Sequence, residues 1–303
     1  MIEGQEGVEW DQWVALARAS EEHGIPALFR SDHYMNLDGQ HPERGSLDAW
    51  GTVCALAAIT ETLRLGTLVS PATFRHPSNL AKLVATADQI SGGRVELGLG
   101  AGWHEREHRA YGFPFPPTRE RMDVLEEQLE VVMRSWVEDE ASFDGAHYTL
   151  EHLDAQPKPV QRPHPPLIMG GNAGPRSARL AARFADEYNT PFPVLGDVRE
   201  RRGRIEEACE RAGREAMPFS VMTCVIVGRD PGDVRDRARR VADKTGTDPD
   251  SPPESWVVGT IEQAVERFGT LAEAGVSRVM CQHLLHEDAG AVALIAEVAA
   301  GLR

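Results

Sequence analysis

The segment VELGLGAGW, residues 95–103, decides the fold of this 303-residue chain. Residues 95–99 form a short apolar run after a helical pattern that ends at Gly92-Gly93, and this run predicts a buried strand. The glycines that follow it predict a turn. The same unit of strand, turn and helix recurs on both sides of this segment. Such alternation predicts an α/β protein with parallel strands joined by right-handed crossovers.

Hydrophobic periodicity places the other elements. Strands are expected at residues 27–30, 63–69, 95–99, 167–169, 187–189, 219–227 and 276–282. Helices are expected at residues 11–23, 48–60, 78–90, 122–136, 176–184, 198–212, 231–243, 261–274 and 288–302. Residues 142–150, with Asp144-Gly145 at their centre, predict a small β-hairpin inserted into this scaffold.

These strands fit either an open doubly wound sheet or a closed (β/α)8 TIM barrel, and the chain length favours the barrel. The sequence shows neither a boundary nor an internal repeat, so we expect residues 1–303 to form a single domain. Met1-Ile2-Glu3 stands where the first barrel strand should end. A first strand clipped at its N-terminal side is therefore expected, with the natural start upstream.

The composition limits the classes of function. The chain carries 47 acidic and 32 basic residues, a formal charge of −15, which disfavours a nucleic-acid or anionic-membrane partner. No apolar run approaches the roughly 20 residues that span a bilayer, and the first residues do not resemble a signal peptide. The four cysteines lie far apart without a C-x-x-C pair, so neither a disulfide framework nor a thiolate zinc site is expected. The composition thus predicts a cytoplasmic acidic enzyme or a binding protein of the same class.

Polar residues and glycines gather where the predicted strands end. Active residues of a (β/α)8 barrel lie at the C-terminal ends of its strands. These ends carry Glu3, Asp32-His33, Val69-Ser70-Pro71, Gly100-Ala101-Gly102-Trp103, Gly170-Gly171-Asn172, Asn189 and Gln282-His283. A ligand site would have this composition, although strand ends in general also run into polar loops.

Two glycine-rich segments could contact a ligand. In GGNAGP, residues 170–175, the bare backbone and the helix start at Pro175 favour an anion such as a phosphate, with Arg176 beside it. A tight turn between strand and helix is the alternative. Residues 98–103 lack the third glycine of a dinucleotide fingerprint, but their backbone would let a flat ring lie against it. Trp103 would then cover the ring or pack beneath the adjoining loop.

Two histidine motifs could carry chemistry. His104-Glu105-Arg106-Glu107-His108 matches the H-E-x-x-H pattern of zinc hydrolases, but Gly112 ends its helix early and no third ligand stands out. A chance match is the alternative. In Asp32-His33 an imidazole stands beside a carboxylate at a strand end, where it could donate or accept a proton near neutral pH. A hydrogen-bonded structural histidine is the alternative for His33.

Several short motifs, taken in order and spacing, resemble one family over essentially the whole chain. They are GVEW (7–10), FRSDHY (29–34), LGTLVS (65–70), RHP (75–77), ELGLGAGW (96–103), GG (170–171) and GV (275–276). Together they resemble the luciferase-like monooxygenase superfamily, and within it the branch that depends on the deazaflavin coenzyme F420. The resemblance implies the same (β/α)8 barrel.

The resemblance also implies where a coenzyme would lie. The residues expected at its ring are His33, Ser70, Gly100, Ala101, Gly102 and Trp103, and those expected at its phosphate are Gly170, Gly171, Asn172 and Arg176. Arg75, His76, Arg106 and Arg176 would have to offset its negative charge. A non-proline cis bond is expected at Leu68–Val69. F420 enzymes that oxidise sugar phosphates or alcohols carry a tryptophan and an acid where this chain has Leu37 and Trp103, which leaves the substrate open.

The leading hypothesis is an F420-dependent oxidoreductase that transfers a hydride between the coenzyme and a small organic substrate. His33 would contact the ring and donate or accept a proton, and Asp32 would orient it. The alternatives are an FMN-dependent luciferase-like monooxygenase, a zinc hydrolase and a non-catalytic flavin-binding barrel. The resemblance further implies a homodimer.

Overall fold

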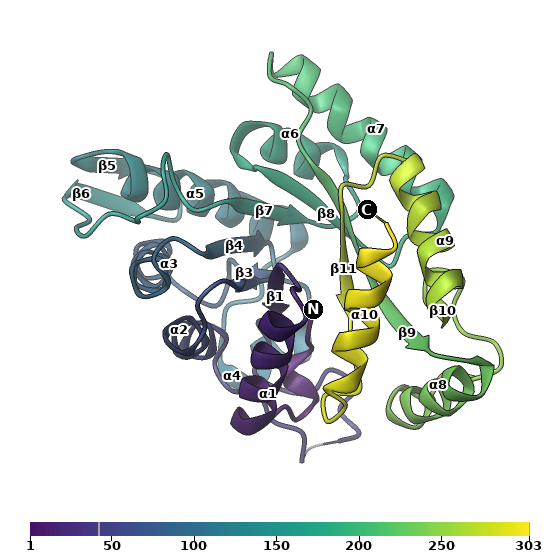
Figure 1. Ribbon diagram of the computed structural model, residues 1–303. Helices are drawn as coiled ribbons and strands as arrows, with labels where there is room; N and C mark the ends of the chain where they lie inside the picture. Colours follow the sequence, from purple (N-terminus) through teal and green to yellow (C-terminus); the bar gives the residue numbers. More distant parts are fainter. Residues whose placement is uncertain (42, 303) are drawn as a thin grey trace.

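A parallel β-barrel surrounded by helices forms the protein in the computed structural model, which describes residues 1–41 and 43–302 (Figure 1). Its strands follow one another in the order β1 (Ala27–Arg30), β2 (Arg64–Thr67), β4 (Val95–Gly100), β7 (Leu167–Gly170), β8 (Glu187–Pro191) and β9 (Phe219–Gly228). The strand β11 (Arg278–Gln282) pairs with β9. All of these pairs are parallel, as the alternation of strands and helices predicts.

The first residues of the chain close the barrel between β1 and β11. Ile2 pairs in parallel with Arg30 at the end of β1. The amino group of Met1 donates a hydrogen bond to the carbonyl oxygen of Cys281 at 2.9 Å, and the amide of His283 donates to the carbonyl oxygen of Met1 at 3.0 Å. The prediction of a (β/α)8 barrel with a short first strand is therefore confirmed.

Helices cover the outer face of the barrel (Figure 1). They are α1 (Trp10–Glu22), α2 (Ala49–Ile59), α3 (Pro77–Ser91), α4 (Glu105–Tyr111), α5 (Thr118–Val137), α6 (Pro175–Phe184), α7 (Leu195–Arg211), α8 (Pro231–Thr245), α9 (Ile261–Glu273) and α10 (Gly290–Ala300). The main core lies between these helices and the strands, and its largest fully buried members include Trp13 and Trp50. Among the described residues, no helix is long and apolar enough to cross a membrane.

Two details differ from the predicted strands. The expected strand at residues 63–69 ends at Thr67, because a cis peptide bond at Leu68–Val69 interrupts it before the short strand β3 (Ser70–Pro71). This cis bond confirms the one that the family resemblance implies. The strand β10 (Val257–Thr260) was not predicted, and it pairs with the last four residues of β9, beyond the segment that pairs with β11.

The inserted hairpin is confirmed. It consists of the antiparallel strands β5 (Ala141–Asp144) and β6 (Thr149–Leu153), and it extends from the side of the barrel next to α5 (Figure 1).

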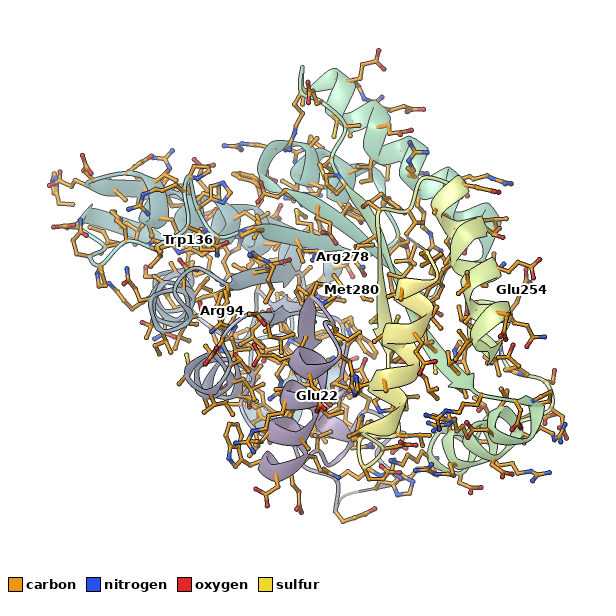
Figure 2. The ribbon with its side chains drawn as sticks, in the orientation of Figure 1. Glu22, Arg94, Trp136, Glu254, Arg278 and Met280 are labelled. Atoms are coloured by element: carbon orange, nitrogen blue, oxygen red, sulfur yellow. The ribbon has the colours of Figure 1, made fainter. Side chains whose placement is uncertain are left out.

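The N-terminal end of the barrel is closed by charged side chains. Arg278, labelled in Figure 2, lies at the start of β11. It forms ion pairs with Glu96 at 2.8 Å and with Glu187 at 2.7 Å. Arg64 pairs with the same Glu96. An apolar cavity of about 330 Å³ lies beside these strand starts, between β1, β11, α1 and α10. Its lining follows β11 from Arg278 to Cys281 and reaches His283, just after the C-terminal end of this strand.

Candidate active site

His33, at the loop that follows β1, is bound to a carboxylate from α4. Its Nδ1 lies 2.7 Å from Oε2 of Glu107, whose side chain has no exposed surface. The other carboxylate oxygen of Glu107 accepts a hydrogen bond from the backbone amide of Tyr34. The described residues provide no hydrogen bond to the Nε2 of His33, and this side chain keeps 12% exposure. One edge of the imidazole is thus fixed, and the other edge can meet a ligand.

The environment of this pair favours its charged form. Burial lowers the pKa of His33, but the hydrogen bond and the charge of Glu107 outweigh it, so the pKa is raised above its ordinary value. Burial raises the pKa of Glu107, but the hydrogen bond and the charge of His33 outweigh it, so this pKa is lowered. The pair therefore favours an imidazolium beside a carboxylate more strongly than a free histidine would.

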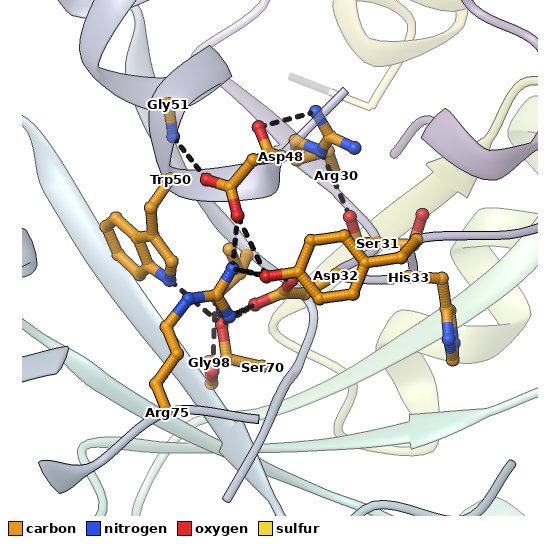
Figure 3. Close-up of polar contacts among 12 residues, drawn as sticks. Arg30, Ser31, Asp32, His33, Asp48, Trp50, Gly51, Ser70, Arg75 and Gly98 are labelled. Atoms are coloured by element: carbon orange, nitrogen blue, oxygen red, sulfur yellow. Dashed lines mark hydrogen bonds and ion pairs between the residues drawn. The ribbon is translucent and has the colours of Figure 1, made fainter. Parts of the chain in front are cut away.

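Asp32 has different partners from the one we expected. Its carboxylate accepts from Arg75 at 2.5 and 3.2 Å and from the hydroxyl of Ser70 at 2.6 Å (Figure 3). The prediction that Asp32 orients His33 is therefore wrong. Successive side chains of an extended segment point to opposite sides, so the two neighbours face different surroundings.

Ser70 belongs to the same buried network. Its side chain also accepts a hydrogen bond from the indole of Trp50 at 3.0 Å, and the residue is only 1% exposed (Figure 3). Tyr34 and Asp48 extend the network toward the surface, because both bind the guanidinium of Arg75. Ser70 therefore belongs to a buried network next to the open end of the barrel that the C-terminal ends of the strands form, called the mouth below. A direct contact of Ser70 with a coenzyme ring stays a prediction.

Bare backbone lines the mouth beside His33. A Cβ atom on Gly100 would lie 2.9 Å from a methyl group of Val69, the residue that follows the cis bond. Ala101 and Gly102 continue this surface, and both are half-buried. Trp103 is 63% exposed, and its ring lies edge-on to the imidazole of His33 with 5.9 Å between the centroids. These residues place close-packed glycine backbone and the exposed Trp103 beside His33, and their contact with a coenzyme ring stays a prediction.

The predicted phosphate loop is only partly available to a ligand. The amide of Gly171 donates to the carbonyl oxygen of Asn189, and the amide of Ala173 donates to the hydroxyl of Tyr188. Gly170 is half-buried and Asn172 is exposed. A Cβ on Gly174, at the start of α6, would meet no atom within 4 Å. The first turn of α6 and the exposed Asn172 thus remain able to contact an anion.

The cations that we expected to offset a coenzyme's charge are largely engaged by the protein. Arg176 pairs with Asp123 at 2.6 Å and with Glu126 at 2.9 Å, because α5 packs against α6. Arg75 pairs with Asp32 and Asp48. The guanidinium of Arg106 binds the carbonyl oxygen of Asn36. The imidazole of His76 accepts from the amide of Ser78 at the start of α3. Arg75 and Arg176 are therefore already paired with acidic side chains of the protein, and their role in offsetting a coenzyme's charge stays a prediction.

The H-E-x-x-H match does not form the geometry of a zinc hydrolase. The helix α4 starts only after His104, and both ring nitrogens of His108 have partners, the hydroxyl of Thr73 at 2.6 Å and the carbonyl oxygen of His104 at 2.8 Å. Glu107, the third residue of α4, binds His33 instead. Within residues 1–41 and 43–302, no group of three potential ligands could hold a metal ion.

Glu107 is the site residue that sequence reasoning did not single out. The available signal was an acid in the first turn of the helix after β4, since such a turn lies next to the mouth. Its partner His33 lies 74 residues away in the sequence, and no local pattern specifies that α4 meets the loop after β1.

The fold and this site define a (β/α)8 barrel with a histidine–glutamate pair beside glycine-rich backbone at the C-terminal ends of its strands. A family model described as luciferase-like monooxygenase matches residues 2–254. The chain therefore belongs to the luciferase-like monooxygenase family of oxidoreductases, and the predicted resemblance is confirmed.

Two relatives and one solved structure illustrate this family. The chain is 33% identical over 204 residues to the F420-dependent glucose-6-phosphate dehydrogenase of Nakamurella multipartita, a match that covers 62% of this chain and 58% of that protein. It is 38% identical over 137 residues to the FMNH2-dependent dimethylsulfone monooxygenase of Pseudomonas putida, which covers 45% of this chain and 37% of that one. The structure of an F420-dependent secondary alcohol dehydrogenase in complex with an F420-acetone adduct superimposes with a TM-score of 0.82 at 21% identity, covering 100% of this chain and 98% of that chain. This last similarity shows the fold.

Proposed function

We propose that this protein is an F420-dependent oxidoreductase that transfers a hydride between the coenzyme and a small organic substrate. The observation that carries the proposal is the placement of His33, whose Nδ1 is bound to the buried Glu107 while its other edge stays available at the mouth. The identity with a relative named as an F420-dependent dehydrogenase supports the choice of coenzyme.

His33 would move the proton that accompanies the hydride. Coenzyme F420, when bound, supplies the hydride donor or acceptor, and the protein supplies binding and proton transfer. In the oxidation of an alcohol, whose hydride would go to the coenzyme, the neutral imidazole of His33 would accept the hydroxyl proton at Nε2. In the reduction of a carbonyl, whose hydride would come from the coenzyme, the imidazolium would donate its Nε2 proton to the carbonyl oxygen. A positioned acid or base of this kind contributes about 10²- to 10⁴-fold to the rate.

The other residues at the mouth would hold the ring and the phosphate. Gly100, Ala101 and Gly102 present backbone without bulky side chains, and Trp103 offers an apolar face. The loop at residues 170–174 and the start of α6 would contact the phosphate end.

An FMN-dependent monooxygenase is the second candidate. The 38% identity with a relative named as an FMNH2-dependent monooxygenase favours it, over less than half of this chain. A monooxygenase would need molecular oxygen at the mouth, whereas the hydride reaction proceeds without it. Anaerobic turnover therefore separates the two candidates.

The test is a turnover assay with two arms. In one arm, the protein is incubated anaerobically with F420 and a panel of secondary alcohols, aldehydes and sugar phosphates, and the deazaflavin absorbance is followed. In the other arm, reduced FMN and oxygen replace F420. We expect turnover in the first arm only; product formed only in the second arm would support the monooxygenase instead.

Variants in the same assay test the proton step. His33→Ala should lower turnover by about 10²-fold or more, while coenzyme affinity changes far less. His152→Ala is the matched control, because this imidazole is 79% exposed on the hairpin. Unchanged turnover in His33→Ala would remove His33 from the reaction.

The single-domain organisation, the cytoplasmic location and the homodimer stay predictions. Light scattering of the purified protein tests the homodimer directly.

A further inference from the structure

We propose that Glu107 is the positioning residue of His33, fixing a proton on Nδ1 and thereby presenting Nε2 to the substrate. The inference rests on the proposed function, because the proton on Nε2 matters only if His33 serves the reaction. The carboxylate comes from α4, which follows β4, and the imidazole from the loop after β1, so the contact joins two segments that follow the C-terminal ends of these strands.

The geometry leaves the carboxylate little freedom. Glu107 is fully buried, and each of its oxygens has a partner, the ring of His33 on one side and the amide of Tyr34 on the other. Because His33 and Tyr34 are adjacent, one carboxylate holds both the ring and the backbone beside it. A buried carboxylate that gives up either partner loses a charge-assisted hydrogen bond in a low-dielectric site.

The other groups near His33 are committed elsewhere. Asp32 is bound by Arg75 and Ser70. Glu3 accepts from the side-chain amides of Gln5 and Gln282, each at 2.7 Å. Neither carboxylate has a hydrogen bond to the imidazole among the described residues, so Glu107 alone can orient it.

His104 lies close to the same carboxylate without sharing it. Its Nδ1 lies 3.9 Å from Oε2 of Glu107 and has no hydrogen-bond partner among the described residues. Burial lowers the pKa of His104, and the charge of Glu107 offsets this decrease only in part. His104 is therefore neutral near pH 7, so the carboxylate of Glu107 pairs with His33 and not with His104.

The test is an NMR titration of protein with ¹⁵N-labelled histidine, without coenzyme or substrate. The signals of His33 are assigned by their loss in His33→Asn. In the wild type, the neutral imidazole should carry its proton on Nδ1, and its pKa should exceed the ordinary value. In Glu107→Gln, the amide can donate to the ring, so the proton should move to Nε2 and the pKa of His33 should fall. Glu105→Gln, on the exposed side of α4, should leave both unchanged.

The outcomes separate this proposal from the proposed function. A proton on Nε2 in the wild type, or an unaltered His33 titration in Glu107→Gln, overturns the positioning role whatever coenzyme the protein uses. The wild-type measurement alone decides the question if Glu107→Gln fails to fold. With F420 and a substrate, the limb of the pH–rate profile that His33 controls should move to lower pH in Glu107→Gln, with turnover about 10²-fold lower. Absence of any F420 turnover in the wild type would instead count against the proposed function.

Discussion

Replacing Arg75 by methionine should destabilise the folded protein by about 3–5 kcal/mol, the usual loss when one member of a buried ion pair is removed. The side chains of Arg75 and Asp32 are 8% and 1% exposed, and two hydrogen bonds join them. Without Arg75, the carboxylate of Asp32 keeps only the hydroxyl of Ser70 as a hydrogen-bond donor among the described side chains. An uncompensated charge then remains in the interior.

The loss of stability translates into a measurable change in Tm. An unfolding entropy of about 2.1 cal/mol/K per residue, summed over the chain, converts the loss to a decrease of about 5–8 °C. Differential scanning calorimetry and chemical denaturation would measure it.

Two further variants test the physical reason. Arg109→Met removes one member of an exposed pair with Glu105 and should cost about 1 kcal/mol or less. The double variant Arg75→Met with Asp32→Asn should cost clearly less than the sum of its single changes, because no charge is left unpaired. A cost below about 1 kcal/mol for Arg75→Met, or strict additivity in the double variant, would refute the reasoning.

Three other outcomes follow from the structure. Burial lowers the pKa of His283 to about 4 and that of His286 to about 3, so the unfolded chain binds more protons below about pH 6.5. The Tm should therefore fall as the pH decreases from 6.5 to 4, and His286→Phe should flatten this fall in a thermal-shift series; parallel curves would contradict it. Trp103→Ala should weaken coenzyme affinity about 2- to 10-fold, from the loss of an aromatic contact, and an unchanged Kd would show that the ring lies elsewhere. Gly98→Ala should destabilise strongly, because its Cβ would lie 2.1 Å from a backbone carbonyl oxygen of β2, whereas Gly203→Ala, in open space on α7, should stabilise by up to about 1 kcal/mol. The opposite order of these two Tm values would contradict the packing.

The barrel could be predicted because its signals are local. Alternating short apolar runs and amphipathic helices appear in the sequence whatever the tertiary contacts are. The strand β10 escaped prediction because Val257–Thr260 runs directly into α9, with no turn between them to mark the end of a strand. The interruption at Leu68–Val69 could be expected only from the family resemblance, since no composition rule marks a non-proline cis bond.

The site could be predicted only in part, for a similar reason. His33 was found because it follows a strand, and its position is set by the chain around it. Its partner was not found, because Asp32 is its neighbour in sequence while Glu107 is 74 residues away. Arg176 stands beside the glycine-rich loop in the sequence, but the acids of α5 neutralise it through helix packing. Local patterns thus locate strand ends, and tertiary packing decides which side chains there remain available.

An equilibrium titration of the purified protein with oxidised F420 and, separately, with FMN tests the central claim most directly. The change in deazaflavin or flavin absorbance and fluorescence on binding gives a Kd for each coenzyme. We predict saturable F420 binding at one site per chain, without comparable binding of FMN, and with His33→Ala retaining the affinity for F420. Saturable FMN binding without F420 binding would contradict the account.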